Sequence, residues 1–296
     1  MSLLAPFSRR TFLIYAGTTT VGAFALGACG SSGSANLALP SGVALVQRFP
    51  NDVLVPGSVR LPISLAVQKG VLTDEDLELP ETLSAKVIDA ASGKTIVQQV
   101  TAAKHTKGVP QPYWPFTVTI DDPGIYSLVV DGGPADGAAF QIFERSVVKI
   151  PLIGDALPPF DTPTKENNGG IDPICTRADG TCPFHAFTVT EALRSGKPVV
   201  YLIGTPAYCQ TGTCAPALDA LISVQKSVGE SALFVHADVY SDSTATTTAP
   251  AVRAYNMSFE PALFITDEKG ILQARLDAIF NEEEIRDVLL LQTGIS

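Results

Sequence analysis

Residues 198–229 read PVVYLIGTPAYCQTGTCAPALDALISVQKSVG. They open on a continuous apolar run, Pro198–Ile203, which is typical of a strand buried on both faces of a sheet. Apolar side chains then recur on one side of a helical period, so we expect a helix over 215–229. Two cysteines, Cys209 and Cys214, stand between the strand and the helix. The stretch therefore predicts an α/β domain with two sulfurs at the start of a helix.

The elements on either side of this stretch extend the α/β pattern. Upstream, Thr188 and Glu191 form a capping box that opens a short helix ending at Gly196. Downstream, the pattern predicts a strand over 232–239, a helix over 249–257, a hairpin over 262–276 and a last helix over 281–292. Strands and helices therefore alternate through this half of the chain, as they do in an α/β domain.

This order of elements resembles the thioredoxin-like fold over residues 155–296, and we predict a thioredoxin-like domain over 151–296. The extended stretch Leu157–Thr162 resembles the lead-in of membrane-anchored redox members of that family. In Phe259-Glu260-Pro261-Ala262, the proline matches the position of the proline that precedes a strand in the family. There it is cis and faces the thiols, so the resemblance implies this role for Pro261.

The resemblance also implies thiol–disulfide exchange, in which the first cysteine attacks and the second resolves the mixed disulfide. It makes Cys209 the nucleophile and Cys214 the resolving cysteine. The spacing departs from the family, because Gln-Thr-Gly-Thr separates the two cysteines in place of two residues. A thiol at a helix N-terminus ionises more easily, and the longer loop brings Cys214 nearer to that end. Either cysteine is therefore a candidate for the lower pKa.

The sequence leaves three chemistries open for the Cys209–Cys214 pair: redox exchange, a structural disulfide and metal binding. Some thioredoxin-fold copper chaperones bind the ion with two cysteines of this loop and one histidine, a donor set that suits Cu(I). Here that set would be Cys209, Cys214 and His185. The loop 240–248, where the copper family carries its histidine, has none. His236 lies inside an apolar strand and is interpreted as a core residue.

A second pair, Cys175 and Cys182, lies in a loop that carries Gly and Asp residues. The two cysteines are separated by six residues, and a disulfide between them would close a short loop. In an oxidising compartment such a close pair is most often structural. We therefore predict a structural Cys175–Cys182 disulfide and assign the redox disulfide to Cys209–Cys214.

The pattern of residues 43–150 predicts a separate all-β domain. Seven short apolar segments, separated by Gly, Pro and Asp, follow the pattern of an antiparallel sandwich. They are Val43–Arg48, Val59–Val67, Ser84–Asp89, Thr95–Thr101, Pro115–Ile120, Ile125–Asp131 and Ala139–Val148. Asp122-Pro123-Gly124-Ile125-Tyr126 carries the D-x-G-x-Y pattern of a tyrosine corner. The domain therefore resembles an immunoglobulin-like sandwich, here without a cysteine for an intersheet disulfide.

The N-terminus resembles an export signal followed by a lipid anchor. Residues 1–28 combine a basic start with a mildly apolar run, and Arg9 and Arg10 match the twin-arginine motif. The sequence LGAC ending at Cys29 resembles a bacterial lipobox, which would make Cys29 the lipid-modified first residue. Residues 29–42 would then form a flexible tether. The resemblance places the rest of the chain at the cell membrane, outside the cytoplasm.

The charge of the chain excludes one class of partner. Acidic residues outnumber basic ones 30 to 20, which gives a formal charge of −10. A nucleic acid would be repelled, because no basic stripe is present to bind its phosphates. A single apolar stretch, Thr11–Ala28, is long enough to enter a bilayer, so a polytopic membrane protein is excluded as well.

The chain looks most like exported bacterial lipoproteins that place an immunoglobulin-like domain before a redoxin-type domain. We therefore predict a membrane-anchored, extracytoplasmic thiol–disulfide oxidoreductase that needs no cofactor. Its expected partners are protein thiols or disulfides outside the cytoplasm, with the membrane contacted through the lipid on Cys29. The alternatives are a non-enzymatic surface binding protein with structural disulfides and a copper chaperone that uses the same cysteine pair.

Overall fold

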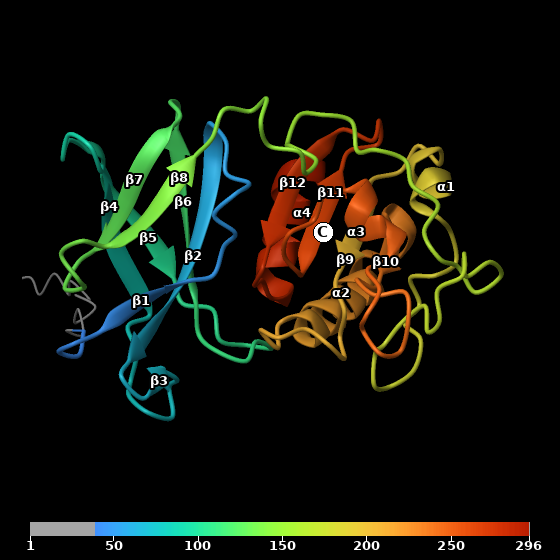
Figure 1. The fold of residues 1–296 in the computed structure, drawn as a ribbon, viewed down its shortest axis with the longest axis horizontal. Coiled ribbons are helices and arrows are strands. Elements are labelled where there is room, and N and C mark those ends of the chain that lie inside the picture. The colour runs from blue at the N-terminus through green and yellow to red at the C-terminus, as the bar shows by residue number, and fades with distance from the viewer. Residues whose placement is uncertain (1–38, 296) are drawn as a thin grey trace, which may run out of the picture. The chain divides into compact units, whose positions relative to one another are not determined.

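The computed structural model describes residues 39–295 (Figure 1). Arg9, Arg10 and Cys29, on which the predicted export signal and anchor depend, lie outside these residues. All of the described residues belong to one structural unit, Leu37–Ser296. Among the helices within 39–295, none has the length and apolar character needed to cross a membrane.

The N-terminal part consists of antiparallel strands in two sheets (Figure 1). One sheet has the order β1-β2-β3 with β6 paired to β2, and the other has the order β5-β4-β7-β8. The strands are β1 (Ala44–Gln47), β2 (Gly57–Val67), β3 (Gly70–Val71), β4 (Thr82–Asp89), β5 (Thr95–Ala103), β6 (Trp114–Ile120), β7 (Gly124–Val130) and β8 (Ala138–Ile142). Buried side chains from both sheets form one apolar core. This part of the chain is all-β, as the sequence predicts.

The alternation of side chains explains how β6 contributes to that core. Phe116, Val118 and Ile120 are buried, whereas the threonines between them are exposed. At the turn into β7, the Tyr126 hydroxyl donates to the Asp122 carbonyl oxygen at 2.9 Å, which confirms the predicted tyrosine-corner contact. Gly124 leaves room for this ring, because a Cβ there would lie 3.2 Å from it.

The C-terminal part contains a mixed four-stranded sheet of order β10-β9-β11-β12. Strand β10 is parallel to β9, while β11 is antiparallel to both β9 and β12. The strands are β9 (Val199–Ile203), β10 (Leu233–Ala237), β11 (Ala262–Thr266) and β12 (Leu272–Asp277). The helices are α1 (Val189–Leu193), α2 (Cys214–Val228), α3 (Pro250–Ala254) and α4 (Glu282–Thr293), with a 3₁₀ turn, η1, at Gly229–Ser231.

Both faces of this sheet are covered, because every residue of β9 is buried. Val200 and Leu202 belong to a core shared with α2 and α4. Val199, Tyr201 and Ile203 belong to a second core shared with α1 and α3. The run of apolar residues is therefore continuous because the strand packs between two apolar layers, as the sequence predicts.

A buried ion pair connects β2 to α4. Arg60 donates to both carboxylate oxygens of Glu284, at 2.5 and 2.8 Å. The Tyr113 hydroxyl donates to the same carboxylate at 2.7 Å. The side chains of Arg60 and Glu284 are only 14% and 11% exposed, so the pair is largely removed from water. Such a pair is costly to break from one side only.

Candidate functional site

The Cys209–Cys214 loop begins where β9 ends. The Cys209 N–H donates to the Thr205 carbonyl oxygen at 3.2 Å, and the Gly212 N–H donates to the Cys209 carbonyl oxygen at 3.1 Å. These bonds fold the loop into consecutive turns. Cys214 is then the first residue of α2, with Thr213 as its N-cap. The sequence prediction of two sulfurs between a buried strand and a helix is confirmed at this point of the fold.

The two thiols share their surroundings with a carboxylate. The sulfurs of Cys209 and Cys214 and a Glu260 carboxylate oxygen all lie within 4.8 Å of one another. The Cys214 thiol donates to Glu260 Oε2 at 3.3 Å, and the Thr205 N–H donates to the same oxygen at 2.7 Å. Glu260 thus contacts Cys214 directly and is held in place by the backbone at the end of β9.

The environment of Cys209 favours its thiolate. Contacts with the Cys214 side chain, the Thr211 hydroxyl and two backbone N–H groups outweigh partial burial and lower the pKa of Cys209 to about 4. The Thr211 hydroxyl oxygen lies 3.2 Å from Cys209 Sγ. A thiolate is the nucleophilic form in disulfide exchange. Cys209 is therefore suited to attack a disulfide at neutral pH.

The environments of Cys214 and Glu260 differ from that of Cys209. Burial, with the nearby Cys209 and Glu260, raises the pKa of the Cys214 thiol well above its ordinary value. Burial also raises the pKa of Glu260 to about 7. Cys214 is 1% exposed, whereas Cys209 is half-buried. Of the two role assignments that the sequence leaves open, these environments favour Cys209 as the nucleophile and Cys214 as the resolving cysteine.

Pro261 lies beside this pair, and its peptide bond with Glu260 is cis, as the resemblance implies. A Cβ on Gly204 would lie 3.2 Å from Pro261 Cβ and 3.5 Å from Cys214 Sγ. Gly204 thus separates the proline from the buried sulfur with only backbone atoms. A side chain at this position would crowd Pro261 and contact the sulfur.

The other pair, Cys175 and Cys182, lies with two histidines. One ligand atom from each of Cys175, Cys182, His185 and His236 lies within 4.8 Å of the other three, and all four residues are buried. The structure thus brings His185 to this second pair and not to the Cys209–Cys214 pair, where the predicted copper set would require it. The four cysteines of the described chain carry free thiols. The two disulfides therefore stay predictions.

Two residues of these clusters were not recognised as site residues in the sequence. Glu260 stands directly before Pro261, and a charged residue at that position is the only local signal for it. His236 is buried, as predicted, but its Nδ1 lies 3.6 Å from Cys182 Sγ, so the interpretation as a plain core residue is incomplete. The sequence offered one signal for a role of His236, namely that it and Asp238 are two polar residues inside an otherwise apolar strand.

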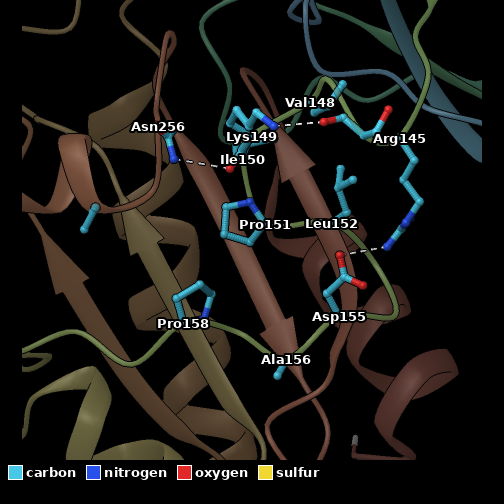
Figure 2. Close-up of a pocket in the computed structure, with 12 residues that line it drawn as sticks. Arg145, Val148, Lys149, Ile150, Pro151, Leu152, Asp155, Ala156, Pro158 and Asn256 are labelled. Carbon is cyan, nitrogen blue, oxygen red and sulfur yellow. Dashed lines mark hydrogen bonds and ion pairs between the residues drawn. The ribbon is translucent and has the colours of Figure 1, made fainter.

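Two surface hollows lined by described residues contain neither cysteine pair. Figure 2 shows one of about 570 Å³ along residues 145–158, where Arg145 lies 2.9 Å from Asp155 and Asn256 donates to the Lys149 carbonyl oxygen. No cysteine or histidine is among its lining residues. Another, of about 850 Å³, lies beside the start of α2 and reaches Ala215 and Pro216. Cavity size alone therefore does not locate the chemistry of this chain.

Comparison with models of protein families gives no match for the chain. Comparison with curated proteins gives no match either.

Proposed function

We propose that the chain is a thiol–disulfide oxidoreductase that acts through Cys209 and Cys214. The observation that carries the proposal is the contact between the buried Cys214 thiol and Glu260, next to a half-buried Cys209 whose thiolate is favoured. A structural disulfide needs neither a proton acceptor nor a low pKa. An exchange enzyme needs both, because one thiol must attack and the other must lose its proton afterwards.

The proposal includes a thioredoxin-like fold for residues 151–296. Its support is a mixed sheet with α1 and α3 on one face and α2 and α4 on the other. Further support comes from Cys214 at the start of α2 and from the position of Pro261 directly before β11. For residues 43–150 we propose an immunoglobulin-like sandwich, on the basis of two antiparallel sheets with a common core and of the Tyr126 contact.

In the first step, the Cys209 thiolate attacks one sulfur of a substrate disulfide. A Cys209–substrate disulfide forms, the substrate S–S bond breaks, and the released substrate thiolate takes a proton from water. The covalent link holds the substrate at the start of α2, beside Cys214. The burial of Cys214 keeps it protonated until this stage, so it does not compete for the first attack.

In the second step, Cys214 gives its proton to Glu260 Oε2, which accepts the thiol hydrogen bond at 3.3 Å. The resulting thiolate attacks Cys209 Sγ, the mixed disulfide breaks, and the second substrate thiolate leaves and takes the proton from Glu260. The substrate gains two electrons and two protons, while the two cysteine thiols become the Cys209–Cys214 disulfide. The same steps in reverse oxidise a substrate dithiol, so the proposal covers exchange in either direction.

We further propose that this chemistry takes place outside the cytoplasm, on a chain anchored to the membrane through a lipid on Cys29. The support is the sequence alone, namely the Arg9-Arg10 pair, the apolar run after it and the small residues before Cys29. The expected substrates are thiols and disulfides of exported proteins, because disulfides persist in that compartment.

The test is catalysis of disulfide reduction by the full chain. With dithiothreitol as the reductant and insulin as the disulfide substrate, the wild-type protein should accelerate reduction over dithiothreitol alone. Cys209→Ser should abolish the acceleration. Cys214→Ser should accumulate a mixed disulfide at Cys209 that mass mapping detects, because no resolving thiol remains. No acceleration, together with a Cys209–Cys214 bond that resists dithiothreitol, would leave a structural disulfide and refute the proposal.

A further inference from the structure

The cluster of Cys175, Cys182, His185 and His236 has no part in the proposed exchange reaction. The first three residues come from the segment that precedes α1, and His236 comes from β10. Their exposed fractions are 6%, 1%, 0% and 0% in that order. Four groups that can bind a metal ion thus converge in the interior, where unpaired polar atoms are costly.

The hydrogen-bond partners of the two imidazoles fix which ring nitrogen carries hydrogen. His185 Nδ1 lies 3.1 Å from the Pro163 carbonyl oxygen, and His236 Nε2 lies 2.9 Å from the Gly204 carbonyl oxygen. A carbonyl oxygen only accepts, so each of these nitrogens must be the donor. In the neutral rings, His185 Nε2 and His236 Nδ1 are then bare acceptors. Both point into the cluster.

These two bare nitrogens lie 3.3 Å from each other, and His236 Nδ1 lies 3.6 Å from Cys182 Sγ. Facing lone pairs repel unless a positive centre lies between them. Zn–N bonds of about 2.0–2.1 Å and Zn–S bonds of about 2.3 Å in a tetrahedron separate two nitrogens by about 3.3–3.4 Å. The same bonds separate a nitrogen from a sulfur by about 3.5–3.6 Å. Both measured separations match the edges of such a tetrahedron.

The surroundings of the cluster also suit a bound cation. The Cys182 N–H donates to Cys175 Sγ at 3.5 Å, a contact that stabilises negative charge on this sulfur. On the far side of His236, Asp238 Oδ1 lies 3.5 Å from Nε2, and both side chains are fully buried. Within residues 39–295, neither oxygen of Asp238 has a hydrogen-bond partner. A carboxylate or carbonyl behind a ligating imidazole is the usual outer contact of a zinc ligand.

We propose that Cys175, Cys182, His185 and His236 bind one Zn²⁺ ion in a tetrahedral site. Two sulfurs and two imidazole nitrogens are a ligand set typical of structural zinc, and four protein ligands leave no position for water or substrate. Burial of all four residues fits a closed, structural site. The ion would connect the segment before α1 to β10. It would lie near the end of β9, after which the Cys209 loop begins.

This site is separate from the proposed exchange centre, so the two proposals can fail independently. The test uses the full chain, reduced and stripped of metal with a chelator, and then titrated with Zn²⁺ alone. We expect about one zinc ion per chain, as for a single four-ligand site. Co²⁺ in place of zinc should give the intense visible absorption of tetrahedral cobalt with a sulfur-to-metal band. Bound zinc should also protect Cys175 and Cys182 from alkylation under native conditions.

Two matched pairs of variants locate the ion. Cys182→Ser and His236→Asn should lose the bound zinc, whereas Cys209→Ser and His105→Asn should retain it, since His105 is the only histidine of the chain outside the cluster. The wild-type cobalt spectrum and the alkylation pattern decide the question even if the first two variants fail to fold. Absence of zinc binding by the reduced wild-type chain overturns the proposal. The proposal is also overturned if Cys209→Ser loses as much zinc as Cys182→Ser. It is overturned as well if Cys175 and Cys182 form a disulfide and the protein binds no zinc after that disulfide is reduced.

Discussion

The Cys214 thiol, which is 1% exposed, donates to Glu260 Oε2 across 3.3 Å. This contact gives the buried thiol a proton acceptor at the place where the proposed exchange mechanism requires one. Glu260 is fixed there because the Thr205 N–H donates to the same oxygen. The pKa of Glu260, raised to about 7 by burial, allows the carboxyl group to accept and release a proton near neutral pH.

Replacement Glu260→Gln should slow the resolution of the mixed disulfide and leave the first attack intact. The amide keeps an oxygen for the Thr205 N–H but cannot take the Cys214 proton. General-base catalysis is worth about 100-fold or more, so we expect a loss of this order in the rate at which the mixed disulfide decays. Stopped-flow kinetics with a chromogenic disulfide separates the two steps.

The pH dependence of the same step provides a control on this assignment. A base with a pKa of about 7 acts when it is deprotonated, so the wild-type resolution rate should rise through neutral pH. In Glu260→Gln this inflection should disappear. A variant that retained the inflection would show that another group accepts the proton.

Alkylation of Cys209 should be nearly independent of pH down to acidic values. Its pKa of about 4 keeps the thiolate dominant at every pH above that value, whereas an ordinary thiol loses reactivity about tenfold per pH unit below about 8.5. The profile is measured by labelling the reduced chain with iodoacetamide over about two pH units on either side of neutral. Mass mapping then gives the extent of labelling at each cysteine.

The Cys214→Ala variant tests the cause of the low pKa. The Cys214 side chain makes the largest contribution to the lowered pKa of Cys209, so its removal should move the labelling profile toward higher pH. An unchanged profile would assign the effect to Thr211 and the backbone N–H groups instead.

Gly204→Ala should destabilise the fold and disturb the thiol pair together. The new methyl group would lie 3.2 Å from Pro261 Cβ, so the proline must shift by a few tenths of an ångström, and it would be in van der Waals contact with Cys214 Sγ at 3.5 Å. Overpacking of this kind costs about 1–3 kcal/mol in the free energy of unfolding, which urea denaturation measures. Gly204→Val adds more volume and should cost more. Equal stabilities of the wild type, Gly204→Ala and Gly204→Val would contradict the close approach of Gly204 to Pro261.

Glu284→Ala should destabilise the chain far more than Glu282→Ala, although both residues lie in the first turn of α4. Loss of Glu284 leaves Arg60 buried without its partner, which costs about 3–5 kcal/mol. Glu282 forms an exposed pair with Arg286, and such pairs contribute about 0.3–0.5 kcal/mol. Urea denaturation of both variants measures the difference, and similar losses would argue against the buried pair.

Much of the sheet and helix pattern is predictable because its signals are local. The apolar run at 198–203 corresponds to β9 at Val199–Ile203, and the helix predicted over 215–229 corresponds to α2 at Cys214–Val228. The strand predicted over 139–148 is less accurate, since β8 ends at Ile142. Beyond it the chain leaves the sheet in a turn, where the Val147 N–H donates to the Glu144 carbonyl oxygen.

The composition of the two clusters is not predictable from local signals. His185 and His236 are 51 positions apart, and they meet because the segment before α1 lies against β10, where the His236 backbone N–H donates to the Phe184 carbonyl oxygen. Glu260 reaches Cys214 over 46 positions because β11 pairs with β9. Both contacts depend on which distant segments lie side by side, which no local periodicity encodes.

The division of the four sulfurs into two clusters has a consequence for oxidative folding. Four cysteines allow three ways of forming two disulfides. Cys175 and Cys182 lie together with the two histidines, and Cys209 and Cys214 lie together with Glu260, so the described part of the folded chain brings each of these cysteines to its neighbour in the sequence. Oxidation of the folded chain is therefore expected to favour the two local pairings over the crossed ones.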